Sequence, residues 1–219
     1  MNHVRAVTLT IALITLTGLC GCQKALSTVD ERGFRTVNLR PYCTAGFATD
    51  KKPDPPWNDL RIFPVGRQEF LGIPFDIIDE TKNHGKSQIE LGSSKHLSDL
   101  LPKQVVNIDL GGLKAKTLYI LQKSAWSVDG NVGEYRLHYA QKDLTEVIPL
   151  VIPKNLKDWH GPRELPEAKV AWSGNNGVAD VGVYLFTWEN PHPEVALKSL
   201  DFISFDSGPV LSLIAITGK

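Results

Sequence analysis

The sequence predicts an all-β protein, either a β-sandwich or a barrel. Three observations support this fold class. Apolar and polar residues alternate at every second position, turn-forming residues separate short runs, and no long stretch shows the 3.6-residue period of an amphipathic helix. The length of 219 residues, with 22% charged residues, fits one or at most two globular domains.

About eleven segments have the character of strands. Residues 134–140 alternate most regularly, and residues 105–110 place Val106, Ile108 and Leu110 on one face. Residues 181–188 are apolar on both faces, as expected for a central strand between two layers. The predicted strands are 36–39, 69–78, 87–92, 105–110, 117–125, 134–140, 146–152, 168–174, 181–188, 197–204 and 211–217.

Residues that interrupt these runs give further expectations. Pro74 and Pro149 lie inside strand-like segments, so these strands are expected at a sheet edge or at a bulge, because proline cannot donate a ladder hydrogen bond. Glycine and asparagine clusters, such as residues 173–177, mark turns. The only helix-like segment is a single turn at Leu97 to Leu101, closed by Pro102.

The N-terminus has the pattern of a targeting segment. Arg5 precedes an apolar stretch of about 13 residues, shorter than the ~20 residues that a membrane-spanning helix needs. Leu19-Cys20-Gly21-Cys22 then resembles a bacterial lipobox. This resemblance implies a signal peptide at 1–21, a lipidated Cys22, a tether at 22–33 and a β-sandwich domain at 34–219. A plain secretory signal is the alternative.

Charge and cysteine content narrow the classes of partner. Lys plus Arg and Asp plus Glu number 24 each, which argues against a nucleic-acid partner. Three cysteines are too few for a disulfide scaffold, and Cys43 is predicted to be a small buried residue rather than a reactive thiol. The resemblance to lipoprotein signals also implies the outer membrane in a Gram-negative source, because Gln23, and not Asp, follows Cys22. The predicted location is therefore the bacterial cell envelope, with the membrane contacted through the lipid.

Motifs of known enzymes are absent from the sequence. There is no Gly-x-Ser-x-Gly elbow, no phosphate-cradling glycine loop, and no histidine pair with the spacing of a metal site. No catalytic residue, metal ligand or cofactor is therefore predicted. A pair of catalytic carboxylates that meets only in the folded chain stays open as an alternative.

Three of the five tryptophans fall where strands end, among polar neighbours. Aromatic faces pack on the C–H faces of sugar rings, and planar polar groups pair with the hydroxyl rim. These positions therefore predict a carbohydrate site, with end-plugging of the sandwich as the alternative. Trp172 and Trp188 lie inside apolar strands and are predicted to pack in the core. The candidate site residues are Trp57, Asn58, Asp59, Arg61, Trp126, Asp129, Trp159 and His160.

Several segments together resemble a known group of domains. They are Gly72 to Ile78, Leu118 to Gln122, Gly133 to Tyr135, Trp188 to Pro193 and Leu200 to Phe202, preceded by Val37 to Tyr42 and Trp57 to Arg61. In this order they resemble galactose-binding-like domains of bacterial glycan-degrading and surface proteins. The resemblance implies a two-sheet antiparallel β-sandwich of jelly-roll type over about 36–218. No binding residue is carried over from it.

The resemblance also implies a metal and a ligand class. A calcium ion often staples such sandwiches near the first loop, where Asp50 and Asp54 are the nearest carboxylates, although no acidic ligand string is present. The function predicted is non-catalytic binding of a glycan by a lipid-anchored envelope protein. An envelope scaffold or protein-interaction module, and a polysaccharide hydrolase or lyase, are the alternatives.

Overall fold

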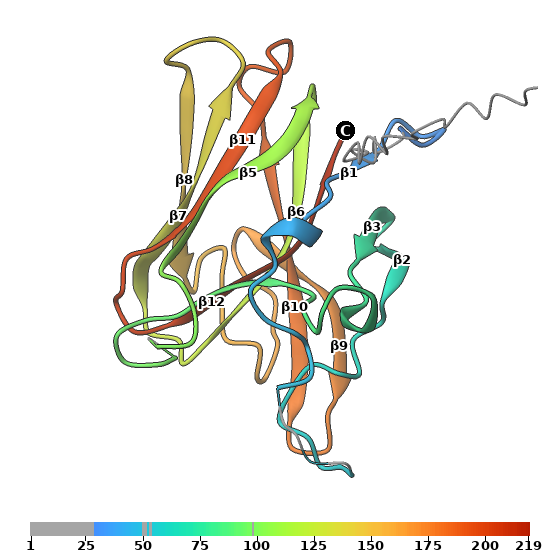
Figure 1. Cartoon of the computed structure of the whole chain (residues 1–219), viewed down its shortest axis with the longest axis vertical. Coiled ribbons are helices and arrows are strands. Elements are labelled where there is room, and N and C mark those ends of the chain that lie inside the picture. Colours follow the sequence, from blue (N-terminus) through green and yellow to red (C-terminus); the bar gives the residue numbers. More distant parts are fainter. Residues whose placement is uncertain (1–28, 50–51, 53, 98) are drawn as a thin grey trace, which may run out of the picture.

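A computed structural model describes residues 29–49, 52, 54–97 and 99–219. Within them the chain forms an antiparallel β-sandwich, which confirms the predicted fold class (Figure 1). The first sheet has six strands, with β12 bordered by β1, β6 and β4, and with β10 and β9 beyond β6. Its strands are β1 (Arg35–Thr36), β4 (Ile89–Leu91), β6 (Thr117–Ala125), β9 (Ala168–Asn175), β10 (Asp180–Glu189) and β12 (Val210–Gly218).

The second sheet has four strands in the order β5-β11-β7-β8. They are β5 (Gln104–Leu113), β7 (Gly130–Tyr139), β8 (Thr145–Ile152) and β11 (Leu197–Ser204). Pro149 lies in β8 at the edge of this sheet, and Pro74 lies in a strand with a single paired neighbour, as predicted for both prolines. An edge strand tolerates proline because its outward N–H has no partner in the sheet.

The main core lies between the two sheets. Alternation along β6 sends Leu118 and Ile120 to this side, where they pack with residues of the four-stranded sheet such as Leu137 and Leu200. All four side chains are fully buried. Burial of such side chains contributes about 1.5–3 kcal/mol each, so this layer is a main source of the free energy of folding.

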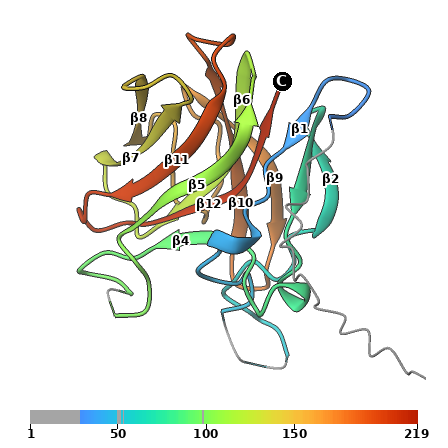
Figure 2. The ribbon, with the colours of Figure 1, turned by 45° about the horizontal axis from the view of Figure 1, so that its top comes forward.

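The outer face of the six-stranded sheet is covered as well. Leu121 of β6 and Val183 of β10 pack there against an aromatic group that includes Phe63 and Phe75. This cover comes from the 47–63 loop and from a hairpin of β2 (Gly66–Phe70) and β3 (Ile73–Ile77), visible beside β9 and β1 in Figure 2. The central strand β10 is thus buried on both faces over most of its length, as its sequence predicted.

The β2–β3 hairpin corrects one prediction. Residues 69–78 were expected to form a single strand, but Leu71 and Gly72 both have positive φ, 52° and 80°, and reverse the chain between the two strands. Two consecutive residues in this region make the tight turn that matches the twist of a hairpin. The predicted strand 36–39 is also shorter, because β1 ends at Thr36 and a 3-10 helix, η1 (Arg40–Tyr42), follows soon after.

Smaller elements complete the chain. A second 3-10 helix, η2 (Glu80–Lys82), follows β3, and neither short helix was predicted. Leu101 N donates to Leu97 O at 3.1 Å, but the described residues of this predicted helix-like segment form a turn and no helix. Trp172 and Trp188 are half-buried against the two hydrophobic clusters. No helix of the described residues is long and apolar enough to cross a membrane.

Cys43 is buried, as predicted, and its Sγ donates to Leu39 O at 3.4 Å. Burial raises the pKa of its thiol to about 12, which keeps it protonated near neutral pH. The predicted signal peptide 1–21, Cys22 and most of the predicted tether lie outside the described residues. The last tether residues form a turn, in which Asp30 Oδ1 accepts hydrogen bonds from the N–H groups of Arg32 and Phe34.

Candidate functional site

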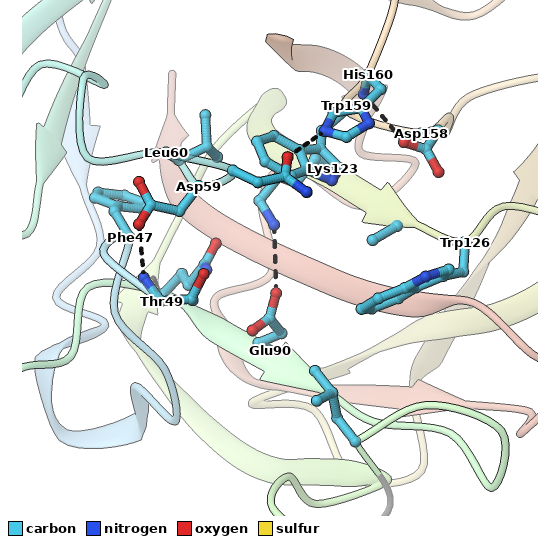
Figure 3. Close-up of a pocket in the computed structure, with 14 residues that line it drawn as sticks. Phe47, Thr49, Asp59, Leu60, Glu90, Lys123, Trp126, Asp158, Trp159 and His160 are labelled. Atoms are coloured by element: carbon cyan, nitrogen blue, oxygen red, sulfur yellow. Dashed lines mark hydrogen bonds and ion pairs between the residues drawn. The ribbon is translucent and has the colours of Figure 1, made fainter. Parts of the chain in front are cut away.

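A pocket of about 360 Å³ opens on the outer face of the six-stranded sheet, where β6 ends and β12 begins. Figure 3 shows side chains from several separate segments turned toward it. Small-molecule sites range from about 300 to 1,000 Å³, so the volume suits a small ligand. Its lining residues are Phe47, Thr49, Asn58, Asp59, Leu60, Gln88, Glu90, Leu97, Lys123, Ala125, Trp126, Asp158, Trp159 and His160.

The floor of the pocket is a polar row across three neighbouring strands. Ser212 of β12 is opposite Glu90 of β4 on one side and Lys123 of β6 on the other. Lys123 Nζ lies 3.3 Å from Glu90 Oε1 and 2.9 Å from Ser212 Oγ, and Ser212 Oγ donates to Glu90 Oε1 at 3.0 Å. Alternation places this row on the same face as the apolar Leu121 and Ile214, so polar residues replace the apolar cover at this end of the sheet.

The upper wall is the 157–160 segment, which is held between β6 and β10. Trp159 N donates to Ser124 O at 2.9 Å, and Gly182 N donates to Trp159 O at 2.8 Å. These two backbone bonds fix the position of the indole, over which Lys123 Nζ lies 5.6 Å from the ring centre. The cation and the aromatic ring attract one another through the ring quadrupole.

His160 continues this wall toward the neighbouring loop. Its backbone N–H donates to Asp158 Oδ1 at 3.0 Å, and its Nε2 lies 3.0 Å from Asn58 Oδ1. Asp158 Oδ2 also accepts from Ser127 N at 3.2 Å. Hydrogen bonds therefore link the two loops that carry Asn58 and Trp126 to the wall between them.

Trp126 forms the opposite side of the mouth. It is 51% exposed and has a positive φ of 52°. His96 stacks on one face of its indole, with the ring centres 4.5 Å apart and the planes 7° apart. An indole has two faces, so this stack fixes the ring and leaves a second face for contact.

Hydrogen bonds connect the segment that carries His96 to the turn after β11. Asp206 is paired with Lys103 Nζ at 2.5 Å and accepts hydrogen bonds from the Ser94 hydroxyl and backbone N–H. The hydrogen bond from Lys103, followed by those from Ser94, lowers the pKa of Asp206 to about 2. This carboxylate therefore stays charged over most of the acidic range and holds the rim of the pocket.

The structure brings together five of the eight predicted site residues. Asn58, Asp59, Trp126, Trp159 and His160 line the pocket. Asp59 is 2% exposed, and its carboxylate accepts hydrogen bonds from Thr49 N and from the Arg61 guanidinium. Its contacts thus hold the 47–61 loop in place beside the pocket.

The other three predicted residues lie outside the pocket lining. Trp57 and Arg61 pack on one another, with the guanidinium carbon 4.4 Å from the ring centre, and Trp57 Nε1 donates to Lys52 O at 3.1 Å. Asp129 is exposed in the turn between β6 and β7. These residues shape neighbouring loops and do not line the pocket.

Sequence reasoning missed the floor of the pocket. The predicted strands contain three polar residues of the pocket lining that were taken as ordinary strand positions: Gln88, Glu90 and Lys123. Lys123 lies two residues after the apolar run from Leu118 to Leu121 in β6, and Glu90 stands between Ile89 and Leu91. Charged residues inside such buried runs were the available signal, because burial of a charge is costly unless the charge is paired.

The described residues include no cluster of three or more His, Cys, Asp or Glu that could hold a metal ion. Of the two carboxylates near the first loop that the resemblance suggests for calcium, Asp54 is exposed in a loop and Asp50 lies outside the described residues. A comparison with protein-family models found none that matches the chain, and a search of curated protein sequences found no significant match.

Proposed function

We propose that this protein binds carbohydrate in the pocket without catalysing a reaction on it. The observation that carries the proposal is that Trp126 and Trp159 line one pocket together with Asn58 and His160. Aromatic faces pack on sugar rings through dispersion and apolar burial, and the amide and imidazole groups pair with hydroxyls at the rim. A floor of paired polar groups completes a site that is apolar at its sides and polar at its base.

The scaffold alternative has less support. A scaffold or protein-interaction module was expected to have no pocket among its loops, whereas this molecule has one that collects residues from four separate segments. Exposed apolar side chains at the rim, such as Leu97 and Trp126, suit a ligand that extends beyond the pocket. Co-purification of a fixed protein partner, with no glycan bound by the pure chain, would favour the scaffold.

The catalytic alternative needs two carboxylates that act on one substrate. Three carboxylates line the pocket, but each has a structural partner: Asp59 pairs with Arg61, Glu90 with Lys123, and Asp158 with two backbone N–H groups. These contacts favour binding over hydrolysis. Incubation of the chain with each bound glycan is expected to release no reducing ends, and steady release would favour the hydrolase or lyase.

We also propose that the protein is a lipid-anchored member of the cell envelope, in the outer membrane if the source is Gram-negative. The resemblance of Leu19 to Cys22 to a bacterial lipobox supports this, and Cys22→Ser is expected to abolish incorporation of radiolabelled palmitate. The pocket and the chain's entry into the domain are at opposite ends of β12: Val210 is opposite Ala125, and Gly218 is opposite Arg35. This separation, roughly 26 Å of strand, would direct the pocket away from the membrane.

The segment order that resembles galactose-binding-like domains is part of the same proposal, and the antiparallel sandwich of two sheets is consistent with it. A glycan array screened with the chain from Gln23 onward tests the function. We expect binding that Trp126→Ala and Trp159→Ala weaken by at least about tenfold, which corresponds to about 1.4 kcal/mol, because each substitution removes an aromatic face that packs on the sugar ring. Binding that both substitutions leave unchanged would contradict the proposal.

A further inference from the structure

The pair Glu90–Lys123 is buried, with side chains 9% and 6% exposed, and yet it lines a pocket. A buried ion pair is a weak source of stability, because the loss of hydration of both charges offsets their attraction. Apolar residues occupy the neighbouring positions of the same sheet face. The placement of two charges at a part of this face that opens into a pocket therefore points to a ligand.

The pair has hydrogen-bonding capacity beyond its internal contacts. An ammonium group carries three donors, of which Glu90 Oε1 and Ser212 Oγ take two. A carboxylate has two oxygens, and both contacts to Glu90 converge on Oε1. Lys123 thus has a further donor, and Glu90 has a further acceptor, side by side at the floor.

Gln88 supplies an independent observation. It lines the pocket and is 2% exposed, and its Nε2 donates to Gly46 O at 3.1 Å. Its Oε1 is buried with no hydrogen-bond partner among the described residues. An amide oxygen accepts hydrogen bonds and cannot donate them, so Gln88 adds a buried acceptor to this part of the pocket lining.

The charges around the pocket disfavour an anion. Glu90 is balanced by Lys123, and Asp59 is balanced by Arg61. Asp158 is held by backbone N–H groups, which stabilise its negative charge and do not cancel it. A ligand carboxylate or sulfate that pairs with Lys123 would also be close to the Glu90 carboxylate. Two negative charges close together in a partly desolvated site repel strongly.

We infer that the floor of the pocket recognises two adjacent hydroxyls of a neutral sugar, and that the pocket discriminates against uronate and sulfated glycans. One hydroxyl donates to Glu90 and the other accepts from Lys123, so that the pair acts as a unit of one acceptor and one donor. This inference rests on the proposed carbohydrate function and adds the class of sugar.

The first experiment screens the full-length chain in detergent against an array of neutral, uronate-containing and sulfated oligosaccharides. Neutral glycans are expected to bind, and the acidic counterparts with the same linkages to bind at least about tenfold more weakly. Equal or tighter binding of the acidic counterparts would overturn the inference and leave the proposed function intact. An array without any binding would overturn both.

The second experiment tests the two residues. The double substitution Glu90→Gln/Lys123→Met removes both charges with little change of side-chain volume. The variant should retain a cooperative thermal unfolding transition and should bind the best neutral glycan at least about tenfold more weakly. Unchanged affinity in a folded double variant would overturn the inference. The single substitution Glu90→Gln leaves the Lys123 cation in place. It is expected to shift the binding preference from neutral glycans toward uronate-containing glycans.

Asp143→Asn is the matched control for removal of one negative charge. Asp143 is exposed in the β7–β8 turn with a positive φ of 61°, which asparagine tolerates. The control is expected to keep the preference for neutral glycans. If Asp143→Asn shifts the preference as much as Glu90→Gln does, the selectivity comes from the net charge of the protein, and the inference is overturned.

Discussion

His96 lies flat on the indole of Trp126, with ring centres 4.5 Å apart and planes within 7°. The two residues come from different loops, one before β5 and one after β6, and of the two Trp126 lines the pocket. The exposed indole is therefore held by a neighbour before any ligand arrives. Such preorganisation reduces the entropy lost when a ligand binds.

This stack predicts an energetic coupling between the two rings. In a double-mutant cycle, His96→Ala, Trp126→Ala and their combination are expected to give a coupling of about 0.5–1.5 kcal/mol in the free energy of unfolding. Urea denaturation measures it. Each single substitution should be mild, because Trp126 is half exposed. Strictly additive effects would show that the two rings do not support one another.

The ion pair at the floor predicts an unusual order of stabilities. Lys123→Met alone leaves Glu90 buried without its cation and is expected to lower the free energy of unfolding by about 3–5 kcal/mol. The double substitution Glu90→Gln/Lys123→Met should recover most of this loss, because no uncompensated charge remains. Chemical denaturation compares the three chains, and a double variant less stable than the single one would contradict this account of the floor.

A buried hydrogen bond between the sheets gives a third prediction. The Tyr135 hydroxyl donates to Gln122 Oε1 at 2.8 Å, and burial raises the pKa of Tyr135, so it stays a donor at alkaline pH. Tyr135→Phe leaves the amide oxygen unsatisfied and should lower the free energy of unfolding by about 1–3 kcal/mol. Tyr184→Phe is the control, since its hydroxyl donates to Asp158 O and accepts from Arg163 N over longer distances, 3.4 Å each. An equal loss in both variants would assign the effect to packing.

The rim of the pocket should respond to acid. Lys103 and then Ser94 lower the pKa of Asp206 from 3.8 to about 2, so the folded protein favours the charged carboxylate. The stabilisation is complete above the unfolded pKa and is lost as the pH falls through about 2. The difference in urea midpoint between the unmodified chain and Asp206→Asn is expected at pH 5 and should shrink between about pH 4 and pH 2. A constant difference over this range would mean that Asp206 acts without its charge.

The sequence was sufficient for the fold where alternation was regular. Residues 134–140 and 181–188 predicted β7 and β10 because each has a consistent period and a defined environment. The hairpin at Leu71 and Gly72 was missed because the apolar residues from Phe70 to Ile73 were taken as one run, while most of β2 is polar and was not predicted as a strand. Only the left-handed backbone of these two residues separates the strands, and Gly72 was the single hint in the sequence.

The walls of the pocket were easier to predict than its floor. Trp126, Trp159 and His160 stand at strand ends, where residue type alone points to a ligand. Glu90 and Lys123 can be recognised as pocket residues only from the register of β4 and β6 against β12. That register depends on pairings between strands far apart in the chain. From residue type alone, Trp57 was predicted to be a site residue, but its ring is packed against Arg61 and does not line the pocket.

The most direct test of the account is titration calorimetry of the best-binding neutral oligosaccharide. The chain from Gln23 onward is compared with Trp126→Ala and with Trp188→Phe, a tryptophan on β10 outside the pocket lining. The account predicts saturable binding to one site, weakened at least about tenfold by Trp126→Ala and retained in Trp188→Phe. Binding that survives Trp126→Ala unchanged, or no binding of any glycan by the folded chain, would contradict it.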